Sequence, residues 1–173
     1  MKSQDLTRIA LMTAILCILA PISIPLPVSS VALTLATFAI YLTAYILKPK
    51  QALAAVGIYL FLGAAGLPVF SGYLSGVSRF AAPGGGYLVG YLILAGISSF
   101  FMHRFSGSPM QIAGMLLGTL AMYAIGTFWL ACTAGISFSA ALPAGMFAFL
   151  PLDTVKIIFS AYIGRKLRQH VKK

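Results

Sequence analysis

The stretch that decides the fold is residues 110–134, MQIAGMLLGTLAMYAIGTFWLACTA, which carries no charged side chain. A helix needs about 20 predominantly apolar residues to cross the hydrocarbon core of a bilayer. A segment of this length and apolarity would have to bury every face if it belonged to a water-soluble protein. We therefore expect residues 110–134 to form a transmembrane helix.

Five further apolar segments flank this one, and each ends at a residue that interrupts a helix or anchors it in water. Pro21 ends the first segment, since proline cannot continue a helix, and Lys48-Pro49-Lys50 ends the second. The sequence thus predicts an all-α integral membrane protein with one domain, 1–173, and six spans at about residues 6–23, 31–47, 51–66, 86–103, 110–134 and 151–168.

Two connections between these spans are long. Residues 66–86 are rich in Gly, Ser and Pro, which predicts a loop between the third and fourth spans. Between the fifth and sixth spans the chain is apolar but interrupted by Gly135, Pro143 and Gly145. We expect residues 135–150 to form a capping loop on the same side of the membrane as the other long loop.

The composition excludes most other classes of protein. The 173 residues are 60% hydrophobic and 8% charged, with a mean hydropathy of +0.98, far from a soluble domain with about 25% charge. The cationic residues lie at the ends of apolar runs, which argues against a nucleic-acid surface. The chain has no nucleotide-binding P-loop, and its two histidines lack metal-ligand spacing. We expect no enzyme activity, no metal and no cofactor.

The charged residues predict an orientation. Twelve Lys and Arg stand against two acids, Asp5 and Asp153, which gives a net charge of +10. If both termini are cytoplasmic, ten of the twelve cations lie on the cytoplasmic side, as the positive-inside rule requires. The remaining two cations are Arg79 and Lys156.

These two cations and one acid form a candidate site on the outer side. Asp153 and Lys156 are three residues apart and share a face at the start of the sixth helix. Arg79 belongs to the loop between the third and fourth spans. Ionisable residues inside a membrane are functional candidates. The alternative is structural: Asp153 and Lys156 pair with each other, and Arg79 holds a lipid phosphate.

Three pairs of small residues four apart predict places where two helices approach closely. They are Ala10 and Ala14, Gly86 and Gly90, and Gly114 and Gly118. Such pairs usually pack within their own helix bundle, and some form contacts with a partner subunit.

Several segments together resemble a known family. They are Ile22-Ser23-Ile24-Pro25-Leu26-Pro27, Leu33-Thr34-Leu35-Ala36-Thr37-Phe38, Gly63-Ala64-Ala65-Gly66-Leu67-Pro68-Val69-Phe70-Ser71-Gly72, Pro83-Gly84-Gly85-Gly86-Tyr87-Leu88-Val89-Gly90-Tyr91 and Phe149-Leu150-Pro151-Leu152-Asp153-Thr154-Val155-Lys156. In order and spacing they are similar to the BioY family, the biotin-specific S components of energy-coupling factor (ECF) transporters.

The resemblance implies a six-helix protein of the cell membrane that captures biotin from outside. It also implies partners, namely a transmembrane coupling (T) subunit and two cytoplasmic ATPases. In this family a pair of small residues in the first helix contacts the coupling subunit, and Ala10 and Ala14 match it.

If the ligand is biotin, the candidate residues can be given roles. An ionised Asp153 suits the ureido N–H groups, and Lys156 can donate to the ureido carbonyl. We assign the valerate carboxylate to Arg79, since a guanidinium can bind a carboxylate through two parallel hydrogen bonds. Tyr73 and Tyr87 are candidates for packing on the bicyclic ring.

The chain also departs from the family's usual motifs. Ala36 replaces a Gln, Gly84 replaces a Thr and Leu152 replaces a Gly, while Ala82 and Ala148 are further differences. These changes keep open a different vitamin-like substrate, such as lipoate or thiamine. A purely structural membrane subunit is the third hypothesis.

Overall fold

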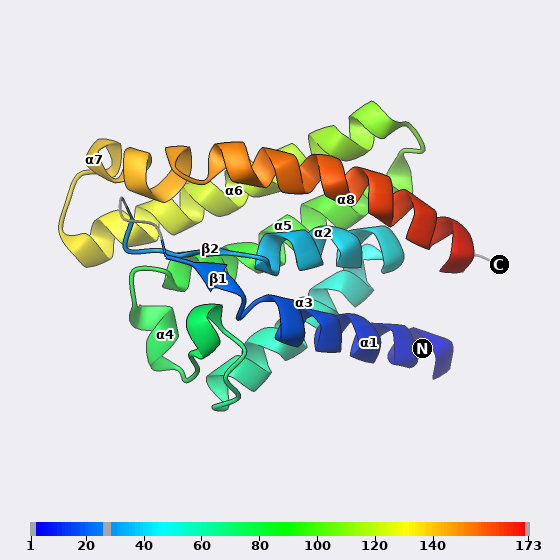
Figure 1. Ribbon diagram of the computed structural model, residues 1–173, viewed down its shortest axis with the longest axis horizontal. Helices are drawn as coiled ribbons and strands as arrows, with labels where there is room; N and C mark the ends of the chain where they lie inside the picture. The colour runs from blue at the N-terminus through cyan, green and yellow to red at the C-terminus, as the bar shows by residue number, and fades with distance from the viewer. Residues whose placement is uncertain (1–2, 26–28, 172–173) are drawn as a thin grey trace.

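The computed structural model describes residues 3–25 and 29–171 of the chain, which fold into one helical bundle (Figure 1). The long helices lie roughly along one axis, and both termini lie at the same end of the bundle. The helices are α1 (Ser3–Leu19), α2 (Ala36–Ile46), α3 (Pro49–Ala64), α4 (Ser78–Ala81), α5 (Gly85–Arg104), α6 (Ser108–Ala134), α7 (Phe138–Leu142) and α8 (Leu150–Val171), with a 3₁₀ turn η1 (Ser71–Tyr73) and a π-helical turn η2 (Pro143–Phe147).

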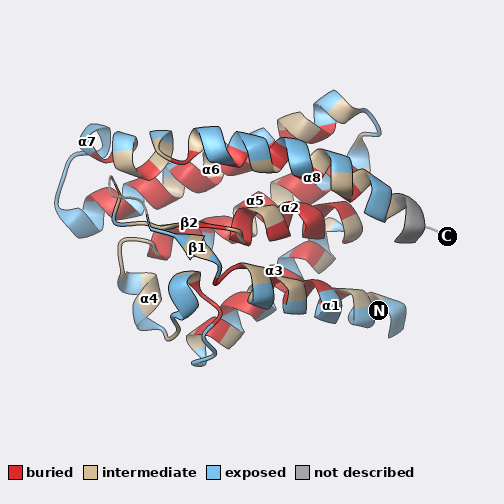
Figure 2. Cartoon of the chain, viewed as in Figure 1, coloured by how far each residue is buried: buried red, intermediate tan, exposed pale blue. Residues whose placement is uncertain are grey.

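Helix α2 lies at the centre of the bundle. It packs against α1, α3, α5 and α8, and nine of its eleven residues are buried. Helices α6 and α8 cover one side, while α1 and α3 cover the other (Figure 1). Figure 2 shows the buried residues facing inward and the exposed residues, many of them large and apolar, on the outer surface. An apolar outer surface of this kind suits a lipid environment.

Glycines bring α5 and α6 into close contact. A Cβ atom on Gly86 would lie 2.3 Å from the Cβ of Trp129, and one on Gly90 would lie 2.8 Å from the Cγ of Met122. On α6, a Cβ on Gly114 would lie 2.3 Å from the Cβ of Phe101 and 2.5 Å from its ring carbon Cγ. The two glycine pairs singled out in the sequence therefore pack inside the protein's own bundle.

The second apolar segment begins differently from the prediction. The sequence predicts a helix at residues 31–47, but α2 starts at Ala36, and two short strands before it pair as an antiparallel hairpin. Strand β1 (Ser23–Ile24) pairs with β2 (Leu33–Thr34), with Ser23 opposite Thr34. The hydroxyl of Thr34 accepts a hydrogen bond from the backbone N–H of Ala36, the first residue of α2, and so forms a local turn between the strand and the helix.

The expected capping loop at residues 135–150 is largely helical. Gly135 ends α6 in the left-handed conformation (φ 66°), and α7 and η2 then return toward α8. Pro143 does not break this segment because it lies at the start of η2, where a missing backbone N–H costs little. The loop between α3 and α5 likewise contains short helical pieces, η1 and α4.

The other predicted spans agree with the helices to within a few residues. By length and composition, α5 and α6 could each cross a membrane among the described residues, and a third span is formed if α7–η2 and α8, which meet at 41°, count as one. Helices α1, α2 and α3 have 17, 11 and 16 residues and are short for a full crossing. The chain is a helical membrane protein.

Candidate ligand-binding site

The centre of the candidate site is the ion pair between Asp153 and Lys156. Both residues lie in the first turns of α8, and the Nζ atom of Lys156 lies 2.6 Å from Oδ1 of Asp153. The side chain of Asp153 is 4% exposed and that of Lys156 is 11% exposed. Lys156 Nζ also donates to the carbonyl of Thr34 at 2.7 Å. The hairpin thus supplies an acceptor to a helix that follows it by more than a hundred residues.

Two hydroxyl groups also donate hydrogen bonds to the carboxylate. Thr37 Oγ1 donates to Asp153 Oδ1 at 3.0 Å, and Tyr123 Oη donates to Asp153 Oδ2 at 2.5 Å. Thr37 also accepts from Lys156 Nζ at 3.1 Å. These contacts distribute the negative charge over three donors, as a buried carboxylate requires.

Sequence reasoning did not single out Thr37 or Tyr123. Thr37 stands in the Thr34–Phe38 motif quoted above, and Tyr123 is a lone tyrosine in the middle of the charge-free segment 110–134. A polar group in such a segment indicates a hydrogen bond to another buried polar group, because a buried hydroxyl needs a partner. Its partner cannot be identified from spacing, since Thr37 and Asp153 are 116 residues apart.

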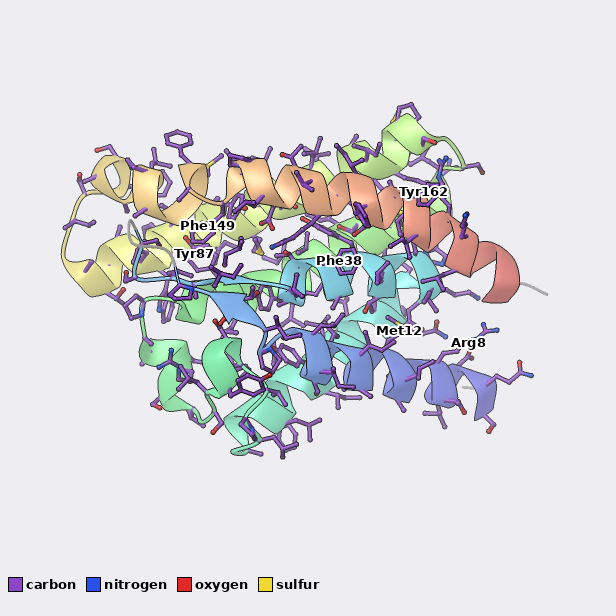
Figure 3. The ribbon with its side chains drawn as sticks, in the orientation of Figure 1. Arg8, Met12, Phe38, Tyr87, Phe149 and Tyr162 are labelled. Atoms are coloured by element: carbon purple, nitrogen blue, oxygen red, sulfur yellow. The ribbon has the colours of Figure 1, made fainter. Side chains whose placement is uncertain are left out.

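A small inner cavity of about 30 Å³ lies beside the ion pair. Asp153 and Lys156 line it together with aromatic side chains, among them Tyr87, Tyr123 and Phe149. The rings of Tyr123 and Phe149 are stacked with centroids 6.4 Å apart, and Figure 3 shows Tyr87 close to Phe149. The hydroxyl of Tyr87 donates to the carbonyl of Gly145 at 2.6 Å, which fixes its ring at the wall of the cavity.

A larger outer chamber of about 490 Å³ adjoins the inner cavity. The two share part of their lining, formed by Val31, Ala32, Thr34 and Tyr91. Arg79 lines the outer chamber and not the inner cavity. The three charged residues predicted to form one cluster therefore lie in two adjoining spaces, with the ion pair in the inner one and the guanidinium in the outer one.

Three of the departures from the usual motifs face this outer chamber. Ala36, Ala82 and Gly84 all line it, while Leu152 is 44% exposed and belongs to neither lining. At Ala36 a methyl group stands where the usual motif has Gln, and at Gly84 a hydrogen atom stands where it has Thr. At these two positions the outer chamber is more spacious and less polar than the family pattern implies.

Tyr73 and the alanine pair lie away from the two cavities. Tyr73 is 67% exposed, has a positive φ of 60°, and does not belong to the described lining of either cavity. Ala10 and Ala14 are exposed on one face of α1, next to the exposed Leu11 and Ile18. Within residues 3–25 and 29–171, no group of three or more His, Cys, Asp or Glu side chains could hold a metal ion.

Comparison with known proteins places this architecture in a family. The sequence model of the BioY family matches residues 1–173. The chain belongs to the BioY family. The resemblance noted in the sequence is thereby confirmed, as is the prediction that the chain is a transport subunit and not an enzyme.

Individual BioY proteins are similar along nearly the whole chain. "Biotin transporter BioY2" of Lactococcus lactis is 35% identical over 96% of this chain and 91% of its own length. "Probable biotin transporter BioY" of Pyrococcus horikoshii is 32% identical over 97% of this chain and 98% of its own length. A crystal structure of the S-component for biotin from an ECF-type ABC transporter superposes with a TM-score of 0.90 at 29% identity, covering 98% of this chain and 95% of that one.

Proposed function

We propose that this protein is a biotin-binding S component, which captures biotin in the inner cavity and outer chamber and releases it on the other side of the membrane. The observation that carries the proposal is the buried Asp153–Lys156 pair on the wall of the inner cavity, with Arg79 in the chamber that adjoins it. Biotin has a matching division into a polar ureido ring at one end and a carboxylate at the other.

The ureido ring would bind at the ion pair. Ionised Asp153 accepts hydrogen bonds through both oxygens, and Oδ2 has one described donor, Tyr123, which leaves room for a ureido N–H. The three protons of Lys156 point to Thr34, Thr37 and Asp153. Donation to the ureido carbonyl therefore requires Lys156 to exchange one of these partners for the ligand.

The valerate chain would extend into the outer chamber toward Arg79. A guanidinium can hold a carboxylate by two parallel charge-assisted hydrogen bonds. Tyr87 and Phe149 would pack on the bicyclic ring from the inner side. Tyr73 has no part in this arrangement, because it is exposed and outside both linings.

Entry of the ring requires the wall between the two spaces to move. About 30 Å³ is room for little more than one or two water molecules. The shared wall is formed largely by Val31, Ala32 and Thr34 at the end of the hairpin, and displacement of this segment would join the cavity to the chamber. Biotin would then order the hairpin and the loop between α3 and α5 around itself.

We further propose six membrane spans in the cell membrane, with both termini in the cytoplasm. Both termini lie at the same end of the bundle, and this supports an even number of crossings. An ECF coupling subunit and two ATPases would supply the energy for release, and the exposed face of Ala10 and Ala14 would contact the coupling subunit.

A thermal-stability panel on the detergent-solubilised protein tests the proposal. We expect biotin to raise the melting temperature, desthiobiotin to do so less, and lipoate and thiamine to have no effect, since a ligand that binds only the folded state stabilises it. Stabilisation by lipoate or thiamine in place of biotin would select another vitamin, a hypothesis that the altered Ala36 and Gly84 support. If none of these ligands raises the melting temperature, the result would favour the hypothesis of a purely structural membrane subunit.

A further inference from the structure

A second polar cavity lies at the opposite end of the bundle from the candidate biotin site. It has a volume of about 230 Å³, and it is lined where α1, the α2–α3 connection, the end of α5 and the end of α8 meet. Figure 3 shows Arg8, one of its lining residues, near the start of α1. The complete described lining is Asp5, Arg8, Tyr45, Ile46, Lys48, Gln51, His103 and Arg168.

Positive charge exceeds negative charge in this basal cavity. Arg8, Lys48 and Arg168 are cationic, and Asp5 is the one acid among the described lining residues. Arg168 uses one of its guanidinium nitrogens, Nη1, to donate to the carbonyl of Met102, and a guanidinium has further N–H groups. The cavity therefore favours an anion.

A buried hydroxyl provides an independent indication of a ligand. Tyr45 is 1% exposed and belongs to the cavity lining, and its Oη makes no hydrogen bond of normal geometry among the described residues; the guanidinium of Arg165 is a neighbour but can only donate, so the hydroxyl proton has no acceptor. A buried hydroxyl without a partner costs roughly 1–3 kcal/mol. An acceptor bound in the cavity would satisfy it.

An apolar groove of about 520 Å³ adjoins this basal cavity. Both are lined by Lys48 and Gln51, and the groove continues between Ile9 of α1 and Ala54 of α3. Lys48 and Lys50 stand at its polar end. A basic cavity joined to an apolar groove matches an amphiphile with an anionic head and a hydrocarbon chain.

We propose that this end of the protein binds an anionic phospholipid, with the phosphate in the basal cavity and one acyl chain in the groove between α1 and α3. The phosphate would be held by Arg8, Lys48 and Arg168, with Tyr45 donating to one of its oxygens. Basic pockets between membrane helices are a known form of headgroup recognition. The site is separate from the Asp153 site and does not depend on the identity of the vitamin.

Native mass spectrometry of the full-length, delipidated protein in detergent tests this proposal. We expect one dioleoylphosphatidylglycerol to remain bound under conditions that remove dioleoylphosphatidylcholine. Lys48→Gln should weaken phosphatidylglycerol about tenfold, and Lys48→Gln with Arg168→Gln should weaken it further, because each change removes a charge-assisted hydrogen bond. Lys48 is exposed, so the single variant remains informative if the double variant does not fold.

Matched controls separate this site from general charge attraction and from a free anion. Lys166→Gln also removes one positive charge, two residues from Arg168, but Lys166 lies on the exposed side of α8. This variant should therefore bind phosphatidylglycerol as tightly as the wild-type protein. Ala54→Trp should fill the groove and weaken the lipid without removing a charge.

Four results would overturn the proposal. They are equal retention of both lipids, equal loss in Lys48→Gln and Lys166→Gln, thermal stabilisation by inorganic phosphate equal to that by the lipid, and an Ala54→Trp variant that loses transport while keeping its lipid. The last result would assign the groove to a partner subunit.

Discussion

Lys156 Nζ lies 2.6 Å from Asp153 Oδ1, one turn along the same helix, and both side chains are nearly buried beside the inner cavity. For stability by itself, well-packed apolar residues of similar volume could replace such a buried pair at little or no cost. Here the pair forms the charged part of a lining that is otherwise aromatic and aliphatic, apart from Thr34 and Thr37. That arrangement suits recognition of a ligand that is polar at one end.

Replacing Asp153 by Asn tests the ligand role directly. The change keeps the size of the side chain but removes its charge and one acceptor, so we expect biotin to bind about 10- to 100-fold more weakly, the equivalent of one charge-assisted hydrogen bond. Isothermal titration calorimetry in detergent measures this. Asp5→Asn, the same change at the other end of the bundle, should bind normally, and unchanged affinity in Asp153→Asn would refute the assignment.

Removing both members of the pair separates binding from stability. Lys156→Met by itself leaves the carboxylate of Asp153 without its counter-ion and should destabilise the fold by about 3–5 kcal/mol. Asp153→Leu combined with Lys156→Met should recover much of that stability, because apolar residues of similar volume can replace a buried pair. We expect the double variant to melt near the wild-type temperature and to bind no biotin. A double variant that binds biotin normally would show that the pair is structural.

Arg79→Gln tests the position of the valerate group. The wild-type protein should prefer biotin to biotin methyl ester, since the ester lacks the charge that a guanidinium binds. Arg79→Gln should lose most of this preference while keeping its affinity for the ester. Competition binding with the two ligands measures the ratio, and Arg104→Gln, an exposed cation at the other end of α5, is the control. If the ratio stays at its wild-type value, the carboxylate is held elsewhere.

Ala10→Trp and Ala14→Trp test the coupling surface. Both residues are exposed, so a large side chain should leave folding and biotin binding intact while it prevents close approach of a partner helix. Uptake of labelled biotin in cells that contain the coupling subunit and ATPases should fall to background. Ala124→Trp makes the same change on an exposed face of α6 and should transport normally. Normal uptake by the α1 variants would exclude this face as the contact.

The close packing of α5 and α6 predicts a stability difference between two glycines. Gly86→Ala would place a Cβ 2.3 Å from the Cβ of Trp129 and 3.0 Å from the carbonyl oxygen of Ile125, so we expect a cost of about 1–3 kcal/mol. Gly57 in α3 has nothing within 4 Å of its Cβ position, and Gly57→Ala should be neutral or stabilise by up to about 1 kcal/mol. Thermal unfolding in detergent compares the two, and equal melting temperatures would contradict the packing argument.

The sequence predicted the helices better than the connections between them. Long apolar runs such as 110–134 identify a membrane helix because the bilayer requires every backbone polar group to be paired within the segment. The hairpin at Ser23 and Thr34 and the helical turns at 138–147 depend on contacts with other elements. Apolarity by itself could not distinguish these from the start of α2 or from a loop.

The sequence by itself determined the class of protein, the family and the shared helix face of Asp153 and Lys156, since hydropathy, motif order and three-residue spacing are local properties. Only the tertiary structure decided that Thr37 and Tyr123 hold the carboxylate, 116 and 30 residues away along the chain. It also divided the predicted outer cluster into an inner cavity with the ion pair and a chamber with Arg79. The reason is physical: a buried charge takes its partners from whichever helices pack against it, and packing joins segments that no sequence spacing connects.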